Sequence, residues 1–265
     1  MQRDHVRQRS RWYGTAFSPL SLFFGGANGA WYDPSDFSTM FQDAAGTTLV
    51  TAVGQPVGRI LDKSGRGNHA YNPSGNSANC PVLQQDGTGR YYLSFNGVNQ
   101  WLQTNSIDFT YGDKMFVSAG VRKLSDAATG CLLELSTTIV SNNGAIQIAA
   151  PGSAAPNYSF RSKGTSLAFA DTSGYSAPIT HTISGIGDIS APNAVLRLNG
   201  SQVAQAAATQ GAGNYGNYPL YIGARAGTSL FFNGRLYGLV VAGKSASASE
   251  IASTESWLNQ KTGAY

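Results

Sequence analysis

The sequence has little charge, few cysteines and no long apolar run. Charged residues make up 12% of its 265 residues, about half of the usual share, and Glu occurs only three times. So little Glu and Lys excludes a helical bundle or a coiled coil. No stretch approaches the ~18 consecutive apolar residues of a membrane-spanning helix, so we expect no membrane insertion. Cys80 and Cys131 cannot form a disulfide framework; they are either one pair or, more simply, two buried thiols.

Glycine and aromatic side chains, by contrast, are plentiful. The chain contains 32 Gly and 11% aromatic residues, whereas Gly usually accounts for ~7%. Low charge combined with many aromatic side chains argues against intrinsic disorder. Since Ser, Thr and Asn are also frequent, the composition predicts an all-β chain with many turns.

The net charge of +4 is concentrated at the N-terminus. The basic residues of this end are Arg3, Arg7, Arg9 and Arg11, and an apolar segment follows with Leu20, Leu22, Phe23 and Phe24. We predict that residues 1–28 form an extended arm that anchors the chain to a protein partner and is mobile until it binds. The remaining residues, 29–265, form the folded domain. Because this domain has no basic stripe, we expect no binding to nucleic acid.

Short apolar segments recur between Gly, Asn, Ser and Pro clusters throughout this domain. Their length and spacing are typical of the strands of a β-sandwich or barrel. The predicted strands are Arg90–Phe95, Met115–Val121, Cys131–Ile139, Ala145–Ala149, Tyr158–Arg161, Ser166–Ala170, Ile179–Ile183, Ala194–Leu198, Gln202–Ala206, Leu220–Ile222 and Leu230–Ala242. One helix follows, because Ser247 and Glu250 form a capping box and Gly263 suits its end. We expect this helix to cover an end or edge of the sandwich.

Several segments resemble the concanavalin A-like, laminin-G-like jelly roll when taken in order. They are Asp62–Ala70, Phe95–Leu102, Val195–Gly200, Tyr221–Arg225, Phe232–Val240 and the closing helix. The resemblance implies an all-β, concanavalin A-like jelly-roll β-sandwich with an extended N-terminal arm and one short C-terminal helix. Asn96-Gly97 and Asn199-Gly200 also predict hairpin turns on their own, because both central positions of a type I′ turn need positive φ.

A narrower resemblance concerns residues 29–58. The segment Gly29–Thr48, together with Val53–Gly58, is similar to a segment of tail and other virion proteins of tailed bacteriophages. This resemblance implies a structural protein of the phage particle, made in the cytoplasm of the host bacterium. Its partners would be other virion proteins, bound through the arm, and copies of itself. Adhesion to the host surface is a possible additional role.

Catalytic chemistry finds little support in the sequence. Retaining glycosidases need two carboxylates ~5–5.5 Å apart, but Glu250 and Glu255 belong to the helix, and Glu134 has no acidic residue two or four positions away. Asp33 and Asp36 lie in a Pro-containing turn and are interpreted as turn residues. We therefore expect no enzyme activity.

Metal and cofactor sites are equally weakly indicated. The widely spaced histidines do not suit zinc; we interpret His69 as a polar loop residue and His181 as a residue of the sheet surface. Asp62 and Asn68 flank a loop that is a weak candidate for Ca²⁺, against the simpler interpretation of a loop held by hydrogen bonds from the backbone to Asp. We expect no cofactor.

The loop Gly211–Tyr218 is the candidate for binding a sugar. Tyr215 and Tyr218 would offer aromatic faces, and Asn217 would offer an amide to the sugar hydroxyls. The same residue types also suit contacts between virion subunits. The sequence thus leaves three functions open: a virion structural protein as the first choice, a receptor-binding lectin as the alternative, and a glycan hydrolase as the least favoured.

Overall fold

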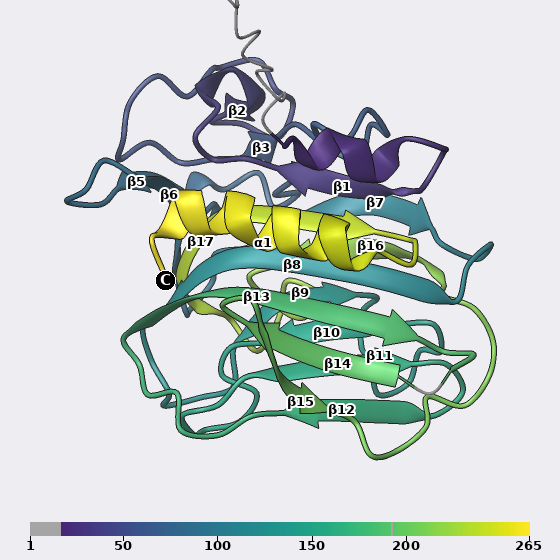
Figure 1. Ribbon diagram of the computed structural model, residues 1–265. Helices are drawn as coiled ribbons and strands as arrows, with labels where there is room; N and C mark the ends of the chain where they lie inside the picture. Colours follow the sequence, from purple (N-terminus) through teal and green to yellow (C-terminus); the bar gives the residue numbers. More distant parts are fainter. Residues whose placement is uncertain (1–16, 192) are drawn as a thin grey trace, which may run out of the picture.

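Two antiparallel sheets pack face to face in the computed structural model, which describes residues 17–191 and 193–265 (Figure 1). The first sheet has the order β15-β14-β13-β8-β17-β6-β5, and β1 also pairs with β17. Its strands are β1 (Gly29–Tyr32), β5 (Val82–Gln85), β6 (Tyr91–Asn96), β8 (Lys114–Lys123), β13 (Ile179–Asp188), β14 (Asn193–Leu198), β15 (Ser201–Gln205) and β17 (Asn233–Ala242).

The second sheet has the order β12-β11-β10-β9-β16-β7-β4-β3-β2. Its strands are β2 (Met40–Phe41), β3 (Arg59–Ile60), β4 (Ala70–Tyr71), β7 (Leu102–Asp108), β9 (Cys131–Leu135), β10 (Ile146–Ala149), β11 (Ser159–Lys163), β12 (Leu167–Asp171) and β16 (Asn217–Ile222). Three short 3₁₀ helices complete the described elements with the helix α1 (Ala248–Thr262): η1 (Pro19–Phe23), η2 (Phe37–Thr39) and η3 (Ser77–Asn79). The predicted β-sandwich is confirmed.

Alternation along β14 shows how the sequence builds the core. Ala194, Leu196 and Leu198 are buried between the two sheets, as the period of two predicts. On the opposite face, Arg197 forms an ion pair with Glu255 of α1. The turn that follows has φ of 49° at Asn199 and 82° at Gly200, which confirms the predicted hairpin. The hairpin predicted at Asn96-Gly97 is wrong, because only Gly97 has a positive φ and the flanking strands β6 and β7 belong to different sheets.

Every predicted strand overlaps an observed one, but six strands were missed: β1, β2, β3, β4 and β5 in the N-terminal third, and β7 just after it. β2, β3 and β4 have two residues each, too few for a visible period. All four residues of β1 are buried, so β1 shows no alternation. One predicted strand was too long. β9 ends at Leu135, four residues earlier than predicted, because Ser136 turns the chain with a φ of 115°.

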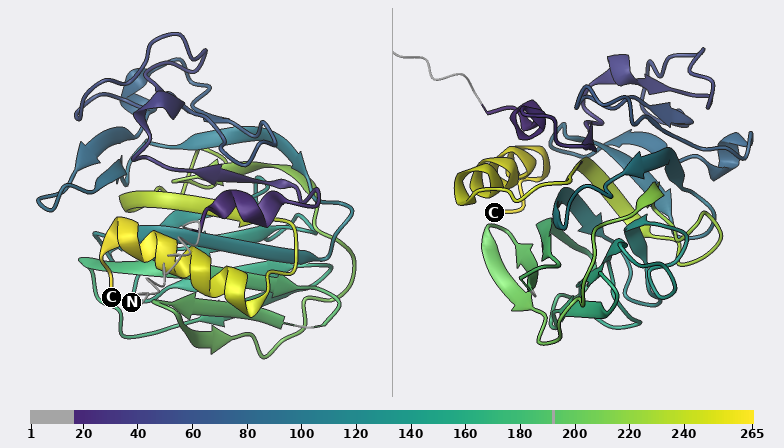
Figure 2. Two further views of the ribbon diagram at one scale, coloured as in Figure 1. Left: turned by 45° about the horizontal axis from the view of Figure 1, so that its top comes forward. Right: turned by 90° about the vertical axis from the view of Figure 1, so that its right-hand side faces the viewer.

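Helix α1 has the predicted ends but a different position from the one expected. Its capping box is present, and Gly263 closes it in the left-handed conformation. The helix does not cover an end of the sandwich. It lies along the outer face of the first sheet, against β8, β13 and β17 (Figures 1 and 2). Gly120 and Gly238 permit this close approach, because a Cβ atom on Gly120 would lie 2.6 Å from Thr262 Cγ2, and one on Gly238 would lie 3.1 Å from Leu258 Cδ2.

The apolar part of the predicted arm packs on the domain itself, so the expectation of a mobile, unpacked segment is wrong for residues 17–28. The side chains of Leu22 and Phe23 in η1 are 0% and 2% exposed. They form a small apolar cluster with Trp31, Phe116, Val240 and Ala242. Only Leu20 and Phe24 remain at the surface, at 37% and 71% exposure. Arg3, Arg7, Arg9 and Arg11 lie outside the described residues.

Candidate functional site

A polar hollow of about 230 Å³ lies on the outer face of the second sheet. It is lined by Ala44, Arg59, Gly67, Asn68, His69, Tyr71 and Asn105. Arg59 of β3 pairs with Tyr71 of β4, and Tyr71 pairs with Gln103 of β7, so these side chains share one face of the sheet. Their neighbours Ile60, Ala70 and Leu102 point the other way, into the core. The short strands missed in the sequence therefore build this hollow.

The loop between β3 and β4 forms one wall of the hollow and is organised by Asp62. Asp62 Oδ1 accepts hydrogen bonds from the backbone N–H of Trp31 (2.9 Å) and of Ser64 (2.8 Å). Its Oδ2 accepts from Ser64 Oγ (2.7 Å) and from the N–H of Asn68 (3.0 Å). The Asn68 amide donates to the carbonyl of Gly29 at 2.7 Å. Because all these groups already have protein partners, Asp62 and Asn68 fit the simpler interpretation of a hydrogen-bonded loop, and the weak Ca²⁺ candidate stays a prediction. No group of three or more His, Cys, Asp or Glu side chains that could hold a metal ion occurs among the described residues.

His69 presents an N–H group next to this loop. Its Nδ1 accepts a hydrogen bond of 3.0 Å from the backbone N–H of Asp62, so the neutral ring carries its proton on Nε2. Burial lowers the pKa of His69 below the ordinary 6.5, and the positive charge of Arg59 lowers it further. The ring is therefore neutral near pH 7 and its Nε2–H remains a hydrogen-bond donor.

Arg59 is held in place without a carboxylate partner. Its side chain packs across Gly46, where a Cβ atom would lie 3.2 Å from Arg59 Cδ. Its Nη1 donates to the carbonyls of Ala44 (3.4 Å) and Ala45 (3.3 Å). None of the ion pairs formed by the described residues includes Arg59. The nearby Asp43 is committed to its own turn, since its carboxylate accepts from Thr47 and Thr48.

Tyr71 and Asn105 complete the wall formed by the sheet. The Tyr71 hydroxyl donates to Asn105 Oδ1 at 2.9 Å, which leaves the Asn105 amide N–H₂ as the outward group. Arg59, His69 and Asn105 thus all offer N–H donors, and none of the described residues that line the hollow is acidic. An arrangement of donors beside an aromatic side chain is suited to hydroxyl or carboxylate oxygens.

In the loop Gly211–Tyr218, which was expected to bind a sugar, Tyr215 is a buried residue of the core. Tyr215 is 1% exposed and its hydroxyl contacts Ser162 Oγ at 2.8 Å, so its ring cannot stack on a ligand and that prediction is wrong. Tyr218 is half-buried and donates to the carbonyl of Asn143 at 3.0 Å, while Asn217 is exposed. A role of Asn217 and Tyr218 in binding stays a prediction.

Tyr111 is a highly exposed aromatic residue near this loop. It lies between β7 and β8, is 92% exposed, and borders a second hollow of about 170 Å³ with Asn28 and Asp108. The loop that contains Tyr215 supports it, because the Asn214 amide donates to the carbonyl of Thr110 at 2.7 Å. No pattern in the sequence points to Tyr111, since the exposure of a side chain depends on neighbours that are distant along the chain.

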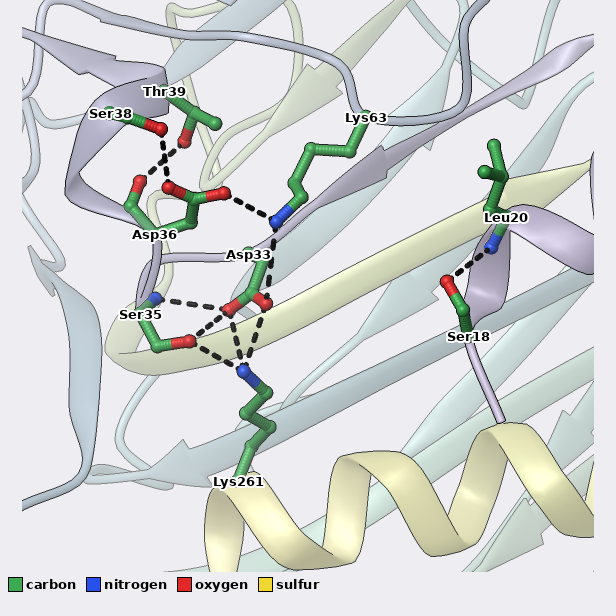
Figure 3. A network of polar contacts seen from close by, with 9 residues as sticks. All are labelled: Ser18, Leu20, Asp33, Ser35, Asp36, Ser38, Thr39, Lys63 and Lys261. Atoms are coloured by element: carbon green, nitrogen blue, oxygen red, sulfur yellow. Dashed lines mark hydrogen bonds and ion pairs between the residues drawn. The ribbon is translucent and has the colours of Figure 1, made fainter. Parts of the chain in front are cut away.

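The carboxylates considered for catalysis are engaged in structural contacts. Glu134 is 0% exposed, and its Oε2 accepts from Arg225 Nε (2.9 Å) and Gln147 Nε2 (2.7 Å). In the turn after β1, Asp33 accepts from Ser35 and Lys261, while Asp36 accepts from Ser38 and Lys63 (Figure 3). This turn agrees with the interpretation from the sequence, and the ion pairs are an addition to it.

The second helix carboxylate and the remaining histidine are also internal. Glu255 is 2% exposed and pairs with Arg197. His181 is 5% exposed and lies 3.0 Å from the Tyr158 hydroxyl, so its expected place on the sheet surface is wrong. Cys80 and Cys131 are two buried free thiols, in agreement with the simpler interpretation. No helix among the described residues is long and apolar enough to span a membrane.

Comparisons with known proteins place this geometry among lectin-like folds. A family model described as "Concanavalin A-like lectin/glucanases superfamily" matches residues 96–252. No curated protein matches the chain.

The solved structures similar to the chain include binding domains of botulinum neurotoxins and of Paraclostridial Mosquitocidal Protein 1. The binding domain of Paraclostridial Mosquitocidal Protein 1 has a TM-score of 0.56 and 15% identity, over 78% of this chain and 51% of that one. The binding domain of botulinum neurotoxin DC, in complex with SialylT, has a TM-score of 0.53 and 11% identity, over 75% and 48%. The ligand-binding domain of botulinum neurotoxin serotype D, in complex with N-acetylneuraminic acid, has a TM-score of 0.52 and 13% identity, over 75% of this chain and 48% of that one. These identities show the fold alone, and the chain spans about half the length of the structures it matches.

Proposed function

Since the chain belongs to the concanavalin A-like lectin/glucanases superfamily, we propose that it is a non-catalytic, lectin-like module that binds a glycan in the hollow beside Arg59, His69 and Tyr71. The observation that carries this proposal is the convergence of N–H donors from β3, β7 and the Asp62 loop on one small polar hollow. Such a set of oriented donors is what recognition of sugar oxygens requires. The similarity to toxin domains solved with SialylT and N-acetylneuraminic acid gives further support by analogy of fold only.

The state of the carboxylates supports binding rather than hydrolysis. A general acid and a nucleophile must both reach the scissile bond. Glu134 and Glu255 are buried in ion pairs, and Glu250 is the N3 residue of the capping box of α1, where it also pairs with Lys244. None of these three groups faces the hollow.

A glycan array with the purified chain tests the proposal. We expect binding by the wild type, loss of binding by Tyr71→Ala, and unchanged binding by Tyr111→Ala, which removes the exposed aromatic beside the second hollow. If Tyr111→Ala loses binding and Tyr71→Ala retains it, the glycan binds instead at the second hollow, beside Tyr111 and the loop Gly211–Tyr218. If no host glycan binds the wild type, the chain is not a lectin.

A second proposal concerns where such a module works. The similarity of Gly29–Thr48 and Val53–Gly58 to phage virion proteins favours a place on the particle of a tailed phage, where the module would be attached through its N-terminal segment and contribute to adhesion. Leu20 and Phe24, which stay exposed on η1, together with the arginines at residues 3–11, are the proposed contacts.

Assembly in the infected host tests this placement. We expect a chain that lacks residues 1–16, or that carries Leu20→Ser and Phe24→Ser, to fold but to be missing from purified particles. Particles that incorporate both variants at the normal level would contradict the anchoring role.

A further inference from the structure

The charge of the hollow narrows the class of ligand beyond the proposed function. Arg59 is a permanent cation whose hydrogen bonds within the described part of the chain go to two carbonyl oxygens, those of Ala44 and Ala45. Its Nε is buried without an acceptor among the described residues. Partly buried charges usually have a counter-charge, and none of the described residues that line the hollow supplies one.

The two polar neighbours of Arg59 also present donors. His69 offers Nε2–H, because its Nδ1 is occupied by the backbone N–H of Asp62. Asn105 offers its amide N–H₂, because its Oδ1 accepts from Tyr71. Asn68, on the rim, uses its amide for the carbonyl of Gly29. A neutral sugar hydroxyl can accept from these donors, but its own O–H then needs an acceptor, whereas an oxyanion has only acceptor sites and matches a set of donors more closely.

The size of the hollow limits what can enter. About 230 Å³ is below the ~300–1,000 Å³ of pockets for drug-sized ligands, which suits one sugar ring rather than a long chain. Gly67 on the rim has no side chain and no atom within 4 Å of an added Cβ, so this side of the hollow is open to an incoming ligand.

On the basis of the proposed glycan-binding function, we propose that the ligand is an acidic sugar whose carboxylate binds Arg59 with support from His69 Nε2–H and the Asn105 amide. A planar carboxylate matches the geometry of a guanidinium, and such charge-assisted hydrogen bonds are about twice as strong as neutral ones. The sugar ring then lies beside Tyr71.

Methyl β-glucuronide and methyl β-glucoside form the matched pair of probes, because they differ only in the carboxylate at C6. We expect NMR titration of the full chain to give at least tenfold tighter binding of the glucuronide, with shifts at the side-chain N–H signals of His69 and Asn105. The affinity for the glucuronide should fall as the salt concentration is raised, because the interaction between the carboxylate and Arg59 is charged and partly exposed to solvent. This salt dependence is measured on the wild type and needs no variant.

Arg59→Gln should reduce the preference for the glucuronide to within twofold, and Arg59→Lys should retain part of it. The control is Arg235→Gln, which removes an arginine that lies over Tyr92 away from the hollow and should leave both affinities unchanged. Equal affinities for the glucuronide and the glucoside at the hollow would overturn the proposal of an acidic ligand and leave the proposed lectin function intact. Tighter binding of glucose 6-sulfate than of the glucuronide would overturn the proposal that the acidic group of the ligand is a carboxylate. Absence of binding by any sugar, here and on the array, overturns both proposals.

Discussion

Lys261 Nζ lies 2.9 Å from each carboxylate oxygen of Asp33, although 228 residues separate the two along the chain (Figure 3). Lys261 is in the last turn of α1, and Asp33 follows β1. A second contact runs beside this one, since Trp31 of β1 and Trp257 of α1 form an edge-to-face pair with ring centroids 5.8 Å apart. Together these two contacts hold α1 to β1 and the turn after it, the segment that precedes the strands and loop lining the hollow.

Replacing Lys261 by Met should destabilise the fold by about 1–2 kcal/mol. Asp33 is 6% exposed, so loss of its main cation leaves a desolvated carboxylate with only hydroxyl and backbone partners and the more distant Lys63 at 4.0 Å. Urea denaturation measures the change. The control, Lys244→Met, breaks a more exposed pair with Glu250 and should cost under about 0.5 kcal/mol. Equal losses in the two variants would show that the Asp33 contact is an ordinary surface pair.

Leu22 and Leu20 offer a direct test of the packing of η1. Leu22→Ala should cost about 3 kcal/mol, because it removes a fully buried side chain from the cluster with Trp31 and Phe116. Leu20→Ala should stay within about 0.5 kcal/mol, since that side chain is at the surface. Thermal or urea denaturation of the free chain compares them. If both variants are as stable as the wild type, η1 does not pack on the sandwich in solution.

Glu134→Gln should act on stability and not on catalysis. The change leaves the guanidinium of Arg225 without its carboxylate in a buried network, which costs about 3 kcal/mol. Denaturation measures this loss, and a reducing-end assay on host polysaccharides should show no release by the wild-type chain. Release by the wild type that disappears in a folded Glu134→Gln variant would make Glu134 a catalytic residue.

His181 should make the fold less stable in acid. Burial, together with the charge of Lys123, lowers the pKa of His181 from 6.5 to about 4. The unfolded chain therefore binds the proton more readily, and stability that is complete above pH 6.5 is lost as the pH falls from 6.5 through about 4. The loss amounts to about 3 kcal/mol. Denaturation of the wild type and of His181→Gln between pH 7 and pH 4 isolates it, since the variant should lack this part of the slope. If the free energy of unfolding depends on pH in the same way in the wild type and in His181→Gln, the lowered pKa of His181 is refuted.

Asp62 should hold its loop without a metal ion. Asp62→Asn replaces an acceptor by an amide that opposes the N–H groups of Trp31, Ser64 and Asn68, so it should cost about 1–3 kcal/mol and weaken any binding in the hollow. The wild-type melting temperature should be the same in EDTA and in millimolar Ca²⁺. A rise of several degrees on adding Ca²⁺ would identify the loop as a calcium site.

The sequence by itself determined those features that depend on neighbours along the chain. The alternation in Ala194–Leu198 placed one face in the core, Asn199-Gly200 formed the predicted turn, and Ser247 with Glu250 capped the helix. Each rests on backbone geometry or on a period of two or three to four residues, which a linear pattern contains. The order of several short Gly-containing segments was enough to indicate the jelly roll.

Only the tertiary structure decided which side chains are covered and which meet. Tyr215 and His181 are in strands or loops whose patterns suggested exposure, yet other strands bury them, and Leu22 and Phe23 find their partners in β1, β8 and β17. The hollow combines Arg59, His69, Tyr71 and Asn105 from two-residue strands, a loop and the longer β7. No local pattern shows that these residues meet, because their proximity follows from strand order and register, which are set by contacts between residues far apart in sequence.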